Sequence, residues 1–295
     1  MQIRDKFKGT GVAIVTPFTA STAIDFPAFE RIADHVIKGG VNYIVLLGTT
    51  GESATMSKQE KKALIEFAVS TINGRVPLVL GIGGNNTSEV VLTIHGTVMK
   101  KIDAVLSVCP YYNKPNQAGI YQHFKAIAEA CPVPVILYTV PGRTSSNISA
   151  DTTLRLANDF KNIIGIKEAS ANFDQIHKVI KNKPEDFLVI SGDDGLTLPL
   201  LASGVDGVIS VVANAYPAEF SKMVNYGLQG NFTEARKLHY LLNDMMNALF
   251  ADGSPAGIKE VLMMKQLCSN HLRLPLVPVN ETTRELLQKL SNKLN

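Results

Sequence analysis

Short apolar runs recur through the first two-thirds of the chain, and helical patterns fill the intervals between them. The runs are rich in valine and isoleucine, and most are continuous rather than alternating, which is typical of parallel strands buried on both faces. They occupy residues 11–17, 43–48, 76–83, 104–110, 133–141, 163–169, 187–191 and 205–211. The pattern therefore predicts parallel strands that alternate with helices.

The intervals carry the signals of helix starts. Asp25 and Asp151 each precede an apolar stripe that they could cap, and Ser57 with Glu60 has the spacing of a capping box. Each strand–helix unit takes roughly 20 to 35 residues, as βαβ units require. Eight units in about 220 residues predict an α/β fold of the (β/α)8 TIM-barrel type. An open doubly wound sheet is the alternative, and the missing G-x-G-x-x-G after the first run disfavours its dinucleotide-binding form.

The strand-like runs stop after residue 215, and helical patterns occupy the rest of the chain. No linker rich in glycine, proline or serine separates the two parts. We therefore predict a catalytic barrel over residues 1–215 and a C-terminal helical region over residues 216–295 that packs on it.

Composition excludes several classes of protein. The 295 residues are 45% hydrophobic and 19% charged, and the net charge of +3 comes without a Lys/Arg cluster, so nucleic-acid binding is not expected. No apolar run approaches the roughly 18 residues of a membrane span, and the N-terminus lacks the apolar stretch of a secretory signal. Three cysteines match neither a disulfide framework nor a zinc site. We expect a cytoplasmic protein with reduced thiols that binds neither nucleic acid nor membranes.

The sixth run, residues 163–168, contains the most informative residue. In a barrel, functional residues lie where strands end and βα loops begin. Strand alternation would point Gly165 and Lys167 into the barrel and Ile164 and Ile166 outward, with the glycine leaving room beneath the amine. Burial disfavours the ammonium form, and a neutral amine is the nucleophile that imine formation needs. A strand-end lysine that reaches out to solvent is the alternative.

Polar residues also follow the second and fourth runs. Gly48-Thr49-Thr50-Gly51-Glu52 presents consecutive N–H groups between two glycines, which could bind a carboxylate or a phosphate. A glycine-rich turn that caps a helix is an equally good interpretation. Tyr111 and Tyr112 follow the fourth run, where adjacent aromatic residues could simply pack at an interface.

The fifth and seventh runs end in further candidates. Tyr138 closes the fifth run, so its hydroxyl should emerge at the barrel mouth, and Arg143 follows a Pro-Gly turn where it could hold a carboxylate. An ordinary surface salt bridge is the alternative for Arg143. Residues 192–195, Gly-Asp-Asp-Gly, could bind a metal ion but better fit a turn with a helix cap. The six histidines show no ligand spacing such as H-E-x-x-H, so we predict no metal.

Taken together, G-T-T-G-E, P-Y-Y-N, Y-T-V-P-G-R-T, G-I-K-E-A and G-V-I-S-V, in this order, resemble the motifs of the dihydrodipicolinate synthase family. That family lies within the pyruvate-dependent, N-acetylneuraminate-lyase-like aldolase superfamily, and the resemblance covers essentially the whole chain. It implies a class I lyase that condenses pyruvate with L-aspartate 4-semialdehyde, the first committed step of the diaminopimelate and lysine pathway. It also implies that no cofactor is needed and that the chain forms a homotetramer of two tight dimers.

The resemblance implies a catalytic role for four residues. Lys167 would form the imine with pyruvate, and Tyr138 would shuttle protons to and from the imine and enamine. Thr49 and Tyr112 would complete a relay of hydroxyl groups, with Tyr112 supplied by a neighbouring subunit.

The same resemblance implies the substrate contacts. The N–H groups of Thr49 and Thr50 would hold the carboxylate of pyruvate, and Arg143 would guide the carboxylate of aspartate semialdehyde. The carbonyl of Ile209 would lie near the lysine side chain, and Gly192, after the seventh run, is assigned to the same substrate-binding set.

Two positions depart from the family pattern, and one separates the synthases from their relatives. Thr139 stands where asparagine is common and Ser145 where glycine is common, but both leave Tyr138 and Arg143 in register. Sialic-acid lyases and keto-sugar-acid aldolases, the nearest alternative, generally lack an arginine at the position of Arg143. A non-catalytic keto-acid sensor is an alternative of another class, which the intact Lys167 disfavours.

Synthases of this family that are inhibited by L-lysine bind it at the dimer interface. Lys58 and Lys61 occupy positions where strongly inhibited members carry histidine, and two ammonium groups should repel a cationic ligand, although exposed charges are well screened. We therefore expect weak or absent inhibition by lysine. The other residues that match that site are Ser53, Ala54, Asn85, Glu89 and Tyr111.

Overall fold

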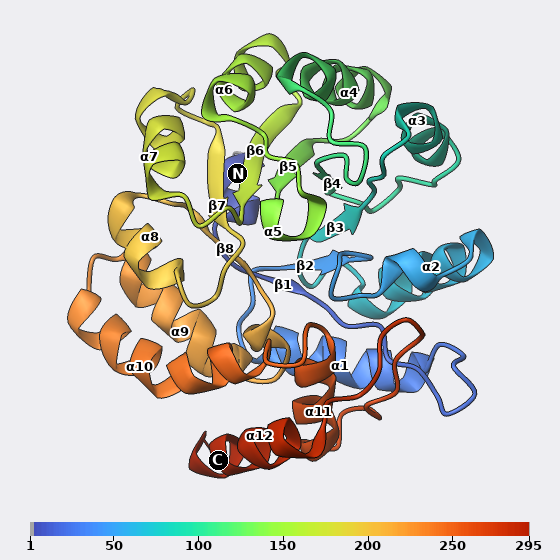
Figure 1. Ribbon diagram of the computed structural model, residues 1–295, viewed down its shortest axis with the longest axis vertical. Helices are drawn as coiled ribbons and strands as arrows, with labels where there is room; N and C mark the ends of the chain where they lie inside the picture. The colour runs from blue at the N-terminus through green and yellow to red at the C-terminus, as the bar shows by residue number, and fades with distance from the viewer. Residues whose placement is uncertain (1–2, 295) are drawn as a thin grey trace.

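Eight parallel strands close into a barrel in the computed structural model, which describes residues 3–294. Each strand is hydrogen-bonded to the strands before and after it in the chain, and β1 pairs with β8 to close the ring. Figure 1 shows the strands at the centre with the helices around them. The predicted (β/α)8 fold is confirmed. The strands are β1 (Gly9–Ala13), β2 (Tyr43–Leu46), β3 (Leu78–Gly81), β4 (Ala104–Val108), β5 (Val135–Thr139), β6 (Ile163–Glu168), β7 (Leu188–Ser191) and β8 (Gly207–Ser210).

Helices connect the strands and then continue beyond the barrel. The connecting helices are α1 (Phe26–Lys38), α2 (Lys58–Ile72), α3 (Thr87–His95), α4 (Gln117–Ala130), α5 (Pro141–Thr144), α6 (Ala150–Asp159), α7 (Phe173–Asn182) and α8 (Thr197–Ser203). Three 3-10 turns accompany them: η1 (Ile3–Phe7), η2 (Ser53–Thr55) and η3 (Val212–Asn214). The last helices are α9 (Pro217–Leu228), α10 (Phe232–Ala248), α11 (Ala256–Met264) and α12 (Glu281–Leu294).

Helix α9 occupies the position of the eighth barrel helix. It contacts β1 and β8 and packs beside α1 and α8. Helices α10, α11 and α12 form the extension, which lies next to α1 and α9 in Figure 1. The region that we predicted to be helical, residues 216–295, thus contains one helix of the barrel as well as the extension.

Local sequence explains where the helices begin, with one correction. The Asp25 carboxylate caps α1, and the capping box of Ser57 and Glu60 is formed at the start of α2. The predicted cap at Asp151 is wrong, because the Ser149 side chain caps α6 instead. Asp151 lies in the first turn of that helix, where a negative charge is favourable to the helix dipole.

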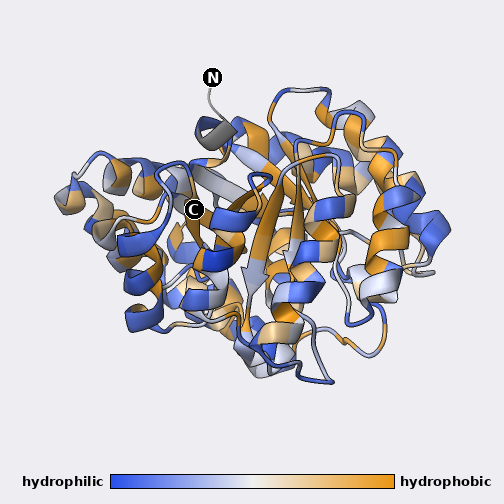
Figure 2. Cartoon of the chain, turned by 90° about the horizontal axis from the view of Figure 1, so that it is seen from above, coloured by the Kyte–Doolittle hydropathy of each residue, from blue (hydrophilic) through white to orange (hydrophobic). Residues whose placement is uncertain are grey.

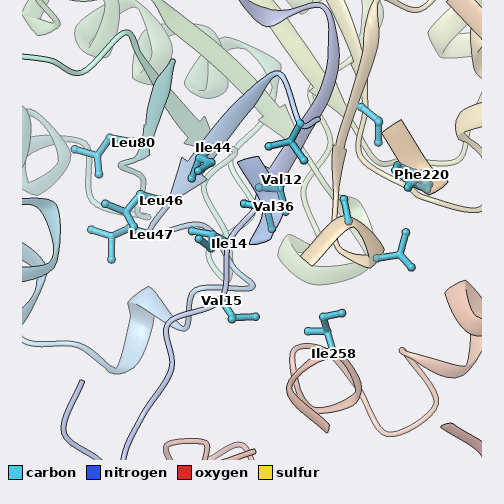
Figure 3. Packing of buried hydrophobic residues seen from close by; sticks show 14 of the residues in the cluster. Val12, Ile14, Val15, Val36, Ile44, Leu46, Leu47, Leu80, Phe220 and Ile258 are labelled. Carbon is cyan, nitrogen blue, oxygen red and sulfur yellow. The ribbon is translucent and has the colours of Figure 1, made fainter. Parts of the chain in front are cut away.

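Two apolar layers hold the barrel together. Along β2, Tyr43 and Val45 point into the barrel, whereas Ile44 and Leu46 pack outward under the helices. Figure 3 shows part of the outer layer, and Figure 2 shows the apolar strands inside a more polar shell. Phe7 from η1 packs edge-on against Tyr43, with ring centroids 5.5 Å apart, and fills the N-terminal end of the barrel. The opposite end is therefore the one left available for chemistry.

The side chains of β6 do not alternate regularly between the two faces of the barrel wall, contrary to the prediction. The register of β6 against β5 shifts between Val135 and Ile136, and Ile164 joins the inner apolar layer while Ile166 stays in the outer one. The expectation that both isoleucines face outward is therefore wrong, since a bulge inserts an extra residue at this point. A Cβ at Gly165 would lie 2.7 Å from the Cβ of Leu188, so the space beside this glycine is used by β7 and is not kept for the amine.

The described residues can be checked for a membrane span, a metal site and disulfide bonds, none of which the sequence predicted. No helix within residues 3–294 is long and apolar enough to cross a membrane. Over the same residues, no group of three or more His, Cys, Asp or Glu side chains is arranged to bind a metal ion. Cys109, Cys131 and Cys268 are all buried free thiols.

Candidate active site

The Lys167 side chain lies inside the mouth of the barrel, near the C-terminal end of β6. It is only 7% exposed, and its strand neighbours are Tyr138 on β5 and Ile190 on β7. The Nζ atom lies 4.4 Å from the centre of the Tyr138 ring, and Lys167 forms no salt bridge to any residue between 3 and 294. A buried amine without a carboxylate partner is placed for chemistry rather than for stability.

Gly192 allows the lysine side chain to extend at this point. A Cβ on Gly192 would lie 2.6 Å from the Cβ of Ala169 and 3.1 Å from Cε of Lys167. The glycine directly after β7, and not Gly165 within β6, is therefore the one whose missing side chain accommodates the lysine. Ile209, from β8, is 1% exposed and belongs to the inner apolar layer with Tyr138.

The turn after β2, residues 48–51, has free backbone donors. The N–H groups of Gly51 and Glu52 donate to carbonyls within the turn, to Gly48 at 3.1 Å and Thr49 at 3.1 Å. The N–H groups of Thr49 and Thr50 have no acceptor among the described residues, so they remain available to an anion. Consecutive backbone donors of this kind form a concave site for a carboxylate.

Three contacts hold this turn in a constrained conformation. Leu47 and Glu52, which flank it, both adopt left-handed backbone angles, with φ of 56° and 52°. Such conformations cost about 1–3 kcal/mol each unless their surroundings impose them. The Thr16 hydroxyl donates to the Gly51 carbonyl at 2.7 Å, and Gly81 on β3 lies so close that its Cβ would be 2.4 Å from the Leu47 carbonyl. The third contact is a buried ion pair to Glu52, described below.

The predicted hydroxyl relay is not assembled within one chain. Among residues 3–294, the Tyr138 hydroxyl makes no hydrogen bond, although Tyr138 is only 8% exposed and lies beside Lys167. Thr49 is exposed, and Tyr112 is 87% exposed on the loop after β4. Tyr112 also has a φ of 73°, an unusual conformation for a bulky residue. The relay therefore stays a prediction, and Tyr112 is presented outward from its own chain.

Arg143 is exposed on α5, the short helix that follows β5. It makes no ion pair with another described residue, so its guanidinium is available. Ser145 caps the C-terminal end of α5 in a left-handed backbone conformation, with a φ of 54°. Glycine adopts this conformation without steric strain, which explains why glycine is common at this position in the family. Thr139, the other departure from the family pattern, donates to Asn147 at 3.0 Å and accepts from the Ile148 N–H.

A partly buried polar network behind Lys167 was not predicted from the sequence. The Glu168 carboxylate accepts from the Ser170 N–H and from Gln175, each at 2.8 Å, and Gln175 is bonded in turn to Asn147. Burial raises the pKa of Glu168, and these donors act against that effect. The network joins β5, β6 and α7 just beneath the mouth. A carboxylate directly beside the motif lysine was the available signal.

An ion pair between Glu52 and Lys259 was not predicted from the sequence either. Both side chains are fully buried, and the charged atoms are 2.5 Å apart. Lys259 lies on α11, 207 residues away in sequence. The signal was present in A-G-I-K-E-V-L-M-M, where two adjacent charged residues interrupt an otherwise apolar helix. Charged side chains in such surroundings are almost never buried unless they are paired.

The residues that match a lysine-binding site lie beyond the C-terminal ends of β2, β3 and β4, on η2, on the first turns of α2 and α3, and on the loops. All are at least partly exposed, and the strands they follow are adjacent in the barrel. Burial lowers the pKa of Lys61, which is partly covered. These residues are Ser53, Ala54, Lys58, Lys61, Asn85, Glu89 and Tyr111.

Asp194, which follows β7, has a buried carboxyl group whose pKa can be tested. One oxygen accepts from the N–H groups of Val211 and Val212 at 3.0 and 2.7 Å, while the other is buried without a partner among the described residues. Burial raises the pKa of this carboxyl to about 6 from 3.8 in the unfolded chain. The folded protein thus holds the proton more tightly, so this contribution to stability is complete below pH 4 and is lost as the pH rises through 6.

We expect Asp194→Asn to remove this part of the pH dependence. Between pH 4 and pH 7, the free energy of unfolding of the unchanged protein should fall relative to that of the variant by about 3 kcal/mol, since one pKa unit corresponds to about 1.4 kcal/mol. Urea unfolding of both proteins across this range measures the difference. Parallel stability curves would show that Asp194 is charged in the folded protein already at pH 4.

Known proteins share this chain's sequence and fold. The model of the dihydrodipicolinate synthetase family matches residues 6–294. The 4-hydroxy-tetrahydrodipicolinate synthase of Flavobacterium psychrophilum is 55% identical over 98% of this chain and 99% of its own length. The dihydrodipicolinate synthase structure from Aquifex aeolicus has a TM-score of 0.95 at 39% identity and covers 98% of both chains. The chloride-inhibited dihydrodipicolinate synthase from Acinetobacter baumannii complexed with pyruvate has a TM-score of 0.94 at 38% identity, covering 97% of this chain and 98% of that one.

Proposed function

The chain belongs to the dihydrodipicolinate synthetase family, and we propose that it carries out the synthase reaction through a Schiff base on Lys167. It is a lyase of lysine and diaminopimelate biosynthesis that condenses pyruvate with L-aspartate 4-semialdehyde to 4-hydroxy-tetrahydrodipicolinate. The observation that supports this mechanism best is the Lys167 amine, buried in the barrel mouth beside Tyr138 and without a salt bridge to any described residue.

In the first half of the reaction, the deprotonated Lys167 amine adds to the ketone of pyruvate, and loss of water gives the imine. The N–H groups of Thr49 and Thr50 hold the pyruvate carboxylate, while Tyr138 moves the protons that form and break the carbinolamine. The imine draws electrons from the pyruvate methyl group, and loss of a methyl proton gives the enamine.

In the second half, the enamine carbon attacks the aldehyde and forms the new carbon–carbon bond. Arg143 orients the carboxylate of aspartate semialdehyde, which a guanidinium can hold through two hydrogen bonds. The amine of the bound product then adds to the imine carbon, closes the ring and releases the Lys167 amine. No step requires a metal or an organic cofactor, and we propose that none is used.

The exposed Tyr112 supports a role for a second subunit. Tyr112 is 87% exposed and has a strained backbone conformation, as expected of a residue that completes a neighbour's site. We propose a homotetramer of two dimers in which Tyr112 and Thr49 extend the proton relay from Tyr138. We also propose a cytoplasmic location, which the three buried free thiols support.

Two measurements test the proposed function. The first is a coupled assay with pyruvate and aspartate semialdehyde, in which we expect turnover. The second is borohydride reduction with pyruvate followed by peptide mass analysis, which should place the adduct on Lys167. Turnover of N-acetylneuraminate in place of aspartate semialdehyde would move the chain to the sister lyases, and binding of pyruvate without a reducible adduct would leave a keto-acid sensor.

We expect L-lysine to inhibit this protein weakly or not at all. Lys58 and Lys61 lie on α2 beside Ser53 and Ala54 and add two positive charges to a surface that would have to accept a cation. Rates measured against L-lysine at several pyruvate concentrations give the inhibition constant. A submillimolar value would contradict the expectation, and replacing Lys58 and Lys61 with histidine should strengthen inhibition if their charge is the cause.

A further inference from the structure

The C-terminal extension makes direct contact with the turn that precedes η2. Lys259 on α11 donates to Glu52 at 2.5 Å and to the His271 carbonyl at 2.9 Å, and its Nζ lies 4.3 Å from the centre of the Phe18 ring. Glu52 is the residue directly after the turn of residues 48–51, whose free N–H groups are proposed to hold pyruvate. A residue of the extension is thus one side chain away from the substrate carboxylate.

A second contact from the same segment strengthens this attachment. The backbone N–H of Arg273 donates to the other oxygen of Glu52 at 3.1 Å, so both oxygens of this carboxylate are bound by the extension. The Arg273 guanidinium donates to the Thr55 carbonyl at 3.1 Å and forms an ion pair with Glu60 on α2. This ion pair lowers the pKa of Glu60 to about 2.

The backbone on either side of the turn explains why such attachment matters. Glu52 is left-handed, with a φ of 52°, and a non-glycine residue keeps that conformation only when its surroundings impose it. The turn itself contains two glycines and could relax in many ways if it were released. Holding the Glu52 carboxylate therefore holds the direction of the Thr49 and Thr50 N–H groups.

Charge gives a second reason. Glu52 is fully buried and follows the proposed carboxylate site directly, so an unpaired negative charge there would repel the pyruvate carboxylate in a poorly screened environment. Lys259 neutralises it. Both geometry and charge predict weaker binding of pyruvate when Lys259 is removed.

We propose that Lys259 is a positioning residue that acts through Glu52 on the turn of residues 48–51, so that the affinity for pyruvate depends on the C-terminal extension. This inference rests on the proposed function, because it takes that turn as the site of the pyruvate carboxylate. Lys259 itself does not touch the substrate.

The test compares Lys259→Met, which removes the cation of the fully buried pair with Glu52, with Arg284→Met, which removes a partly exposed cation of α12 paired with the buried Glu260 of α11. Arg284 contacts the fully buried Glu260 at 3.0 Å and joins α11 to α12, away from the turn. For Lys259→Met we expect the pyruvate KM to rise at least about tenfold, with the aspartate semialdehyde KM within about twofold, whereas Arg284→Met should leave both within about twofold. Borohydride trapping at increasing pyruvate concentration should show the same shift.

Two further variants keep the test decisive if Lys259→Met folds poorly. The double variant Glu52→Gln with Lys259→Met leaves no unpaired buried charge, so it should fold. Its pyruvate KM should nevertheless stay raised, because the ion pair that holds the turn of residues 48–51 to α11 is absent. Glu52→Gln alone leaves the Lys259 cation buried without a carboxylate, so it should be less stable than the double variant, and its pyruvate KM should also rise because the charged contact that holds the turn is lost. Equal pyruvate KM values for the Lys259 and Arg284 variants, or an unchanged KM in the double variant, would overturn the proposal. An unchanged protein that forms no pyruvate adduct would instead overturn the proposed function.

Discussion

Replacing Lys167 with alanine is expected to reduce kcat at least about 10⁴-fold, as removal of a covalent nucleophile does in other enzymes. Without the amine there is no imine, so nothing acidifies the pyruvate methyl group. The Lys167 side chain packs beside Gly192 and the Tyr138 ring and makes no ion pair with another described residue, so truncating it leaves no charge unpaired and should leave the fold intact. The coupled assay measures the loss of turnover, and borohydride reduction with pyruvate should yield no adduct.

Lys161→Ala is the matched control for this change. Lys161 is exposed and lies two residues before β6 begins, at the opposite end of the same strand. Its replacement should change kcat by less than about twofold, because exposed side chains away from a site rarely matter. Residual turnover above about 1% in Lys167→Ala, with retained folding, would show that the reaction does not pass through this amine.

Replacing Tyr138 with phenylalanine is expected to lower kcat by about 10²- to 10⁴-fold, the usual effect of losing a general acid–base group. The ring stays, so its contact with Lys167 and its place in the inner apolar layer are retained. Slow formation of the pyruvate adduct should persist, since Lys167 is present. The result separates proton transfer from imine formation, provided that kcat and borohydride trapping are measured on the same preparation.

Tyr121→Phe gives the control for losing a tyrosine hydroxyl. Tyr121 on α4 is 9% exposed and donates to Asp159 at 2.7 Å, away from the barrel mouth. We expect it to lower stability through the lost hydrogen bond to Asp159 and to leave kcat within about twofold, because Tyr121 does not contact Lys167 or Tyr138. If both tyrosine variants keep normal turnover, Tyr138 has no part in proton transfer.

Most of the barrel could be predicted because its strands and helix starts are specified by residues close together in the sequence. Continuous valine- and isoleucine-rich runs are required when both faces of a strand are buried, and each of the eight strands lies within or overlaps one predicted run. Capping at Asp25 and at Ser57 was also readable, since a cap involves residues three apart. The errors were local as well: Ser149, two residues before Asp151, offered an equally good cap and forms it.

The site was only partly predictable. Strand ends and motifs identified Lys167, Tyr138, Thr49 and Thr50, and the structure brings the lysine and the tyrosine together on adjacent strands. The outward Ile164 was mispredicted because a bulge depends on how β6 meets β5 and not on β6 alone. The predicted hydroxyl relay to Tyr112 would need a neighbouring subunit, and it stays a prediction.

Local patterns in the amino-acid chain were sufficient to predict the eight strands, the order of the helices and Lys167 as the candidate nucleophile, because each depends on residues close together in the sequence. Long-range folding alone established that Gly192 accommodates that lysine and that Lys259 pairs with Glu52 across 207 residues. The physical reason is that burial of a charge is decided by the partner that folding brings to it, and no local pattern specifies a partner so distant in sequence.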